Sequence, residues 1–237
     1  MSRLGWLLIV TGALVWGCSS KESKREVSGT SGRTKSEIDA FAKRMRTLRE
    51  RTPEPRDDLG DEPCPDEQLE RATRGAPAPL LVADYDYLER FVRPEIDPHA
   101  GRGAAFRLLT TPALRAVVPA PRITDESMGN DVLFRIKKLD EEYDYVAVLR
   151  TSERLLPRRE GGKFHGGRLA GHLVISDLAT GKPLCRARVD AESSSEVAGI
   201  QGSDPERVLK NDFYAKVRDA IGAAVRRVSR ILREDLG

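Results

Sequence analysis

An alternating pattern in the C-terminal third constrains the fold of this chain more than any other feature. Residues 168–193 read RLAGHLVISDLATGKPLCRARVDAES, two strand-like stretches around a turn. Small or apolar residues alternate with charged ones in the second stretch: Cys185, Ala187, Val189 and Ala191 against Arg186, Arg188, Asp190 and Glu192. A period of two is that of a β-strand with one buried face. Because Asp177 can bond the turn backbone and Gly181 suits a left-handed conformation, the pattern predicts a β-hairpin.

A wide apolar stripe follows the hairpin at helical spacing, from Leu209 to Ile231. Asp204, Pro205 and Glu206 supply an N-cap, a first-turn proline and a first-turn acid. We therefore expect a long amphipathic helix that continues past Ile231 and packs on the hairpin face that carries Cys185. The fold class predicted is α+β, a small antiparallel or mixed sheet covered by helices.

Shorter segments complete this expectation. The runs at 79–85 and 143–152 predict strands, and the run at 130–142 predicts a helix. The stretch 154–164, rich in arginine and glycine, is expected to be a loop.

The N-terminus has the plan of a signal peptide. Arg3 precedes an apolar run of 13 residues, Leu4 to Trp16. As a helix this run would rise about 20 Å, which is short of the roughly 30 Å hydrocarbon core of a bilayer. The polar, serine- and lysine-rich segment that follows is typical of a flexible tether.

The residues Val15-Trp16-Gly17-Cys18 resemble the lipobox of bacterial lipoproteins, with Trp16 in place of the usual small residue. The resemblance implies cleavage before Cys18, acylation (palmitate or a similar chain) of that cysteine and attachment to a membrane through the lipid. Ser19 and Ser20 imply, by the sorting rule of enteric bacteria, the periplasmic face of the outer membrane.

We expect four segments: a signal peptide at 1–17, a tether at 18–35, an N-terminal helix with a proline- and acid-rich linker at 36–79, and the α+β domain at 80–237. Ser36 is the expected N-cap of that first helix.

Motifs for catalysis and cofactors are missing from the sequence. There is no HExxH, GxSxG, P-loop or GxGxxG motif, and no metal or cofactor is expected. The histidines His165 and His172 flank a glycine-rich stretch and are expected to have no ligand role. The acids Asp84, Asp86 and Asp144 lie beside predicted strands, where carboxylates are usually solvated or cap turns. A net charge of +3 gives no case for nucleic acid.

Cys64 and Cys185 lie outside the expected signal peptide and tether. With Cys18 lipidated, Cys64 and Cys185 remain as a pair that could form a disulfide in an oxidising compartment, although Cys64 would then have to reach the buried hairpin face.

The arginines Arg226, Arg230 and Arg233 share one face of the expected last helix. They could contact an anionic partner, or simply favour the helix C-terminus and solvate it.

The last 100 residues loosely resemble a class of envelope lipoproteins that includes the curli-secretion and penicillin-binding-protein-activator lipoproteins and the N-terminal domain of the Tol–Pal translocation protein. The matching stretches are 143–149, 177–184 and 209–228. The chain is therefore expected to be a non-enzymatic, membrane-anchored envelope lipoprotein whose partner is an envelope protein or peptidoglycan. The alternatives are an envelope hydrolase with an unrecognised site and a lipoprotein that binds a small ligand.

Overall fold

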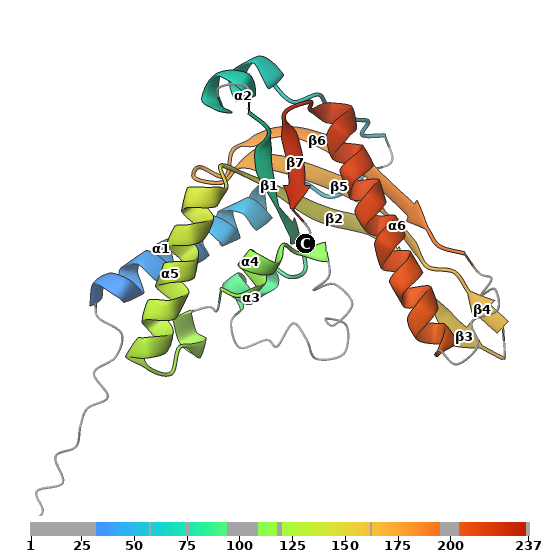
Figure 1. Ribbon diagram of the computed structural model, residues 1–237, viewed down its shortest axis with the longest axis horizontal. Helices are drawn as coiled ribbons and strands as arrows, with labels where there is room; N and C mark the ends of the chain where they lie inside the picture. The colour runs from blue at the N-terminus through green and yellow to red at the C-terminus, as the bar shows by residue number, and fades with distance from the viewer. Residues whose placement is uncertain are drawn as a thin grey trace, which may run out of the picture.

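The computed structural model describes residues 32–56, 58–73, 76–93, 109–117, 120–161, 163–194 and 204–235. Its centre is a five-stranded sheet in the order β6-β5-β2-β1-β7 (Figure 1). The strands are β1 (Ala78–Asp84), β2 (Tyr145–Leu155), β5 (Arg168–Asp177), β6 (Pro183–Glu192) and β7 (Leu232–Asp235). Strand β1 pairs in parallel with β2 and β7, whereas β5 is antiparallel to both of its neighbours. The expected α+β fold is confirmed, and the sheet is mixed.

Helices cover both faces of the sheet. One face carries α6 (Pro205–Val228), and the other carries α1 (Gly32–Arg51) and α5 (Glu126–Glu142) with the short α3 (Glu89–Val92) and α4 (Pro112–Arg115) (Figure 1). The remaining helices are α2 (Asp66–Thr73) and the 3₁₀ helix η2 (Ala120–Arg122).

The two faces of the central strands fill two separate cores. Leu80 of β1 and Leu149 of β2 belong to the core under α6, while Leu81 and Val148 belong to the core under α1 and α5. A strand buried on both faces needs a continuous apolar run, which is what "LLVA" (residues 80–83) in β1 supplies.

The predicted hairpin is confirmed as β5 and β6. The four alternating residues that include Cys185 are buried, and Arg188, Asp190 and Glu192 are exposed. Asp177 Oδ1 accepts hydrogen bonds from the backbone N–H (2.7 Å) and hydroxyl (2.6 Å) of Thr180, and Gly181 has φ +65°. Helix α6 packs against β6, as its apolar stripe predicted.

Helix α6 ends earlier than expected, at Val228. Ser229 adopts an extended backbone conformation, and its hydroxyl accepts the N–H groups of Ile231 and Leu232. Asp66 of α2 fixes this turn, because its carboxylate accepts the Ser229 hydroxyl (2.6 Å) and the N–H of Arg230 (3.1 Å). The chain then reverses into β7 and pairs with β1, so the prediction of a helix past Ile231 was wrong.

Two other predictions from the sequence were wrong. The stretch 154–164 is not a loop: β2 runs on to Leu155, and β3 (Arg158–Glu160) and β4 (Lys163–His165) form a second hairpin with Gly161 at φ +57°. Helix α1 begins at Gly32 rather than after Ser36, because Thr34 is already buried and Arg33 pairs with Glu37 (3.2 Å).

Candidate functional site

A buried aspartate marks the carboxyl end of β1. Asp84 is 0% exposed, and its Oδ1 accepts the N–H groups of Asp86 (2.9 Å) and Tyr87 (3.3 Å). Its Oδ2 accepts a hydrogen bond from the guanidinium of Arg154, near the end of β2. Because β1 and β2 are parallel, their carboxyl ends meet at one edge of the sheet and bring together two residues that lie 70 positions apart.

The environment of Asp84 perturbs its ionisation. Burial raises the pKa of Asp84 to about 6, and the nearby Asp86 carboxylate adds to this rise. The guanidinium of Arg154 opposes it, and that same guanidinium also binds Asp86 Oδ2 at 3.0 Å. The guanidinium of Arg154 therefore bridges one buried carboxylate, that of Asp84, and one exposed carboxylate, that of Asp86.

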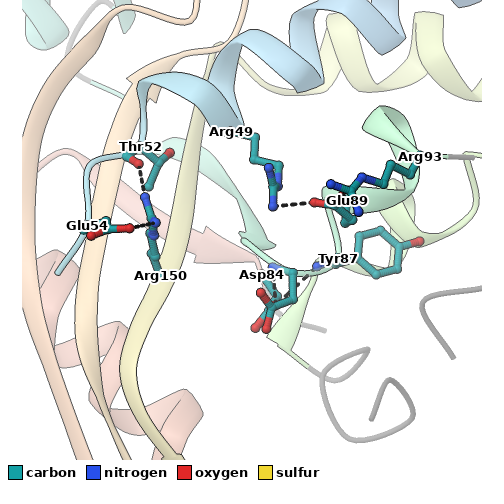
Figure 2. A network of polar contacts seen from close by, with 9 residues as sticks. Arg49, Thr52, Glu54, Asp84, Tyr87, Glu89, Arg93 and Arg150 are labelled. Carbon is teal, nitrogen blue, oxygen red and sulfur yellow. Dashed lines mark hydrogen bonds and ion pairs between the residues drawn. The ribbon is translucent and has the colours of Figure 1, made fainter. Parts of the chain in front are cut away.

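Further arginines surround Tyr85, the residue after Asp84. The guanidinium carbons of Arg49 and Arg150 lie 4.4 and 4.3 Å from the centroid of its ring. Figure 2 shows the contacts of these arginines: Arg49 forms an ion pair with Glu89, and Arg150 donates to the carbonyl of Thr52 (2.8 Å) and to Glu54 (2.9 Å). These contacts join α1, α3 and the segment after α1 to the carboxyl edge of the sheet.

The chemistry open to this network is limited by its own bonds. The three oxygen–donor contacts of Asp84 come from backbone N–H groups and an arginine, the pattern of a carboxylate that fixes a turn. Asp144 lies at the opposite end of β2, where it is exposed. Of the three acids considered from sequence, the structure thus brings together Asp84 and Asp86 only. Arg154 was missed, because nothing local in the sequence indicates a partner so distant.

The histidines do not converge. His172 lies buried on β5 with Nε2 2.8 Å from the carbonyl oxygen of Leu59, and His165 is exposed on β4 of the other sheet. His99 lies outside the described residues. Within those residues the structure holds no cluster of three side chains that could bind a metal ion.

Cys64 and Cys185 are joined in a disulfide that spans 121 positions of the chain. Both residues belong to the core under α6, so Cys64 does reach the buried face of the hairpin. Next to it, Glu62 and Arg186 exchange backbone hydrogen bonds of 2.9 and 3.3 Å. The proline- and acid-rich segment is therefore fastened to the outer edge of β6.

The three arginines do not share a helical face. Arg226 lies on α6, Arg230 in the turn after it and Arg233 on β7, because α6 ends at Val228. Arg226 lies 3.8 Å from Glu234, and Arg230 lies 3.5 Å from Asp66. The prediction that these three arginines share one face of a helix was wrong.

An open groove of about 470 Å³ lies beside the edge of β6. Nine residues line it: Asp58, Leu59, Gly60, Asp61, Arg188, Asp190, Ala220, Ala223 and Arg227. Arg227 of α6 donates to Asp61 (2.8 Å) and to the carbonyl of Arg188, and the N–H of Arg188 bonds Asp61 (2.7 Å). Burial would raise the pKa of Asp61, but the bonds from Arg227 and Arg188 outweigh it and hold that pKa below its usual value.

The edge of β6 is capped along only part of its length. Arg186 and Arg188 present their outward backbone groups to Glu62, Asp61 and Arg227. Outward groups recur at every second residue of a strand, so those of Asp190 come next. They have no hydrogen-bond partner in the described part of the chain.

Cys18 and the tether before Gly32 lie outside the described residues. No helix in the described ranges is both long and apolar enough to span a bilayer. No family model matches the chain, and searches among curated proteins and solved structures give no significant match.

Proposed function

We propose that this chain is a bacterial envelope lipoprotein, anchored through lipid on Cys18, whose α+β domain binds an envelope protein or cell-wall polymer and is not an enzyme. The observation that carries the proposal is the disulfide between Cys64 and Cys185. Structural disulfides persist in oxidising compartments such as the periplasm and are rare in the cytosol. The bond therefore supports export, the step that the lipobox-like residues 15–18 require. It does so from residues remote from the predicted signal peptide.

The groove beside β6 supports a binding role. An exposed strand edge offers backbone donors and acceptors to an extended segment of a partner, which can add to the sheet as a further strand. Here the edge is capped at Arg186 and Arg188 and open at Asp190, and the groove beside it is floored by Ala220 and Ala223 of α6. Small residues leave room for the side chains of such a segment.

Metabolic labelling tests the anchor. In a Gram-negative host, the wild-type chain should incorporate labelled fatty acid and sediment with membranes. Cys18→Ser should lose the label, because the acylated sulfur is gone, while Cys64→Ser should keep it. Label that persists in Cys18→Ser would contradict lipidation at this residue.

The same cells test the binding role. A photo-crosslinking amino acid at position 190 should form a discrete adduct with an envelope component, because it lies on the open edge. The matched control is position 130, which is exposed on α5. Adducts of equal yield at both positions, or none at 190, would contradict binding at this edge.

A hydrolase is the second candidate, favoured by the raised pKa of Asp84. It requires that the purified protein release soluble fragments from peptidoglycan, and that Asp84→Asn abolish this release. Against a hydrolase, both carboxylate oxygens of Asp84 already accept hydrogen bonds, from Arg154 and from two backbone N–H groups.

A further inference from the structure

The second hairpin, β3–β4, is an exposed and strongly basic element. Among residues 155–168 there are four cationic side chains, Arg158, Arg159, Lys163 and Arg168, and one carboxylate, Glu160. All five are exposed. The whole chain, by contrast, has nearly balanced charge, with 40 basic and 37 acidic residues. The positive charge is therefore local to this hairpin and its base.

The ion pairs that these cations form with nearby acids do little to neutralise the positive charge. Arg158 lies 3.1 Å from Glu160, and Arg168 lies 3.2 Å from Glu153. All four of these side chains are at least 39% exposed, and ion pairs in water at this exposure contribute little. Arg159 lies over the ring of Phe164 (5.5 Å), and Lys163 has no ion pair with any described residue. The guanidinium and ammonium groups can thus exchange these partners for phosphates at small cost.

An apolar side chain stands at the base of the same hairpin. Leu155 is 50% exposed, and Leu155 and Phe134 are the two large hydrophobic residues exposed in the described ranges. Phe164, on β4, is half-buried. A free polyanion would use the cations alone, whereas a membrane interface takes up both cations and neighbouring apolar side chains.

We propose that the β3–β4 hairpin docks on a membrane surface containing anionic phospholipid, with Arg158, Arg159 and Lys163 at the phosphates and Leu155 toward the acyl boundary. The inference rests on the proposed lipoprotein function, since the anchor would hold the domain beside the membrane. A tether of this kind supplies a high effective concentration, so even a weak contact orients the domain.

Docking through the β3–β4 hairpin would also set the position of the groove relative to the membrane. Figure 1 shows β3 and β4 beside the first turns of α6, while α2 lies toward the other end of that helix. The α6 residues of the groove, Ala220, Ala223 and Arg227, belong to its second half. A domain resting on its hairpin would hold the groove away from the lipid, where a partner can reach it.

A tryptophan reporter tests the proposal in the full chain. Both native tryptophans, Trp6 and Trp16, precede Cys18, so cleavage leaves the lipidated protein with none. Phe164→Trp protein is reconstituted into phosphatidylcholine vesicles with or without phosphatidylglycerol. In anionic vesicles the emission should shift to the blue and be quenched by brominated lipid, and 1 M salt should reverse both changes, because the Debye length falls to about 3 Å. The control reporter is Phe134→Trp, on α5, which should show neither change.

Charge reversal sharpens the test. Arg158→Glu, Arg159→Glu and Lys163→Glu together should abolish the quenching of Trp at 164, since each cation contributes about fivefold to partition. The same change in net charge at Arg135, Lys137 and Lys138, which are exposed on α5, should leave it unchanged. Leu155→Ser should weaken the quenching without altering charge.

Three outcomes would overturn the proposal: equal quenching at positions 134 and 164, equal quenching in neutral and anionic vesicles, or equal loss from both sets of charge reversals. Fatty-acid labelling is read first on the same preparations. Absence of the label contradicts the lipid anchor only. The hairpin is then tested by mixing the unlipidated Phe164→Trp protein with the same vesicles and subtracting the tryptophan signal of the wild-type protein.

Discussion

At the scale of single residues, Asp84 makes stability depend on pH. Its pKa is about 6 in the folded protein, above the ordinary value of 3.8. The folded state therefore holds more protons than the unfolded state between these values, and the free energy of unfolding falls as pH rises through this window. The total change is about 3 kcal/mol, from a side chain that is 0% exposed.

Asp84→Asn should remove this dependence. Urea unfolding of the wild type and the variant at several values between pH 4 and pH 7 should show the wild type losing stability relative to Asp84→Asn as pH rises. Arg154→Met should extend the window above pH 6, because the guanidinium that opposes the rise in pKa is gone. Parallel curves for wild type and Asp84→Asn would show that the pKa of Asp84 is not raised.

At the scale of elements, Asp66 decides where α6 stops and β7 starts. Asp66→Ala leaves the Ser229 hydroxyl and the Arg230 N–H without their acceptor. We expect a loss of about 1–3 kcal/mol in the free energy of unfolding, with faster hydrogen exchange in β7 than in α5. Asp131→Ala is the control, because its exposed pair with Arg135 should contribute less than about 0.5 kcal/mol. Unchanged exchange in β7 would contradict this role of Asp66.

Elements with a complete local signal could be predicted from sequence. The β5–β6 hairpin carries its alternation and its turn residues within 26 positions, and the start of α6 carries Asp204 and Pro205 side by side. The end of α6 could not be predicted, because apolar spacing continues to Ile231 while the residue that ends the helix, Asp66, is 163 positions from Ser229. The same limit hid the Asp84–Arg154 pair, which only the parallel pairing of β1 and β2 brings together.

At the scale of the whole molecule, the Cys64–Cys185 disulfide ties the segment after α1 to the far edge of the sheet. Replacing both cysteines by alanine should lower the free energy of unfolding by about 2–5 kcal/mol, because the bond closes a long loop in the unfolded chain. Urea unfolding with and without a reducing agent measures the loss, and the agent should not affect the double variant.

Alkylation followed by mass spectrometry gives an independent check of the bond. In the native, unreduced protein neither Cys64 nor Cys185 should be modified, and both should be modified after reduction and unfolding. Modification of Cys64 in the unreduced protein would show that the bond is absent.

The span of that disulfide also bears on the order of assembly. Cys64 and Cys185 lie 121 positions apart, and both must reach an oxidising compartment before they can pair. Until Cys185 arrives there, the one other cysteine of this chain that the Cys64 thiol can meet is Cys18. Acylation of the Cys18 sulfur would remove this competitor and leave a single pairing. Lipid attachment would then act as a safeguard against a wrong crosslink, in addition to holding the protein in place.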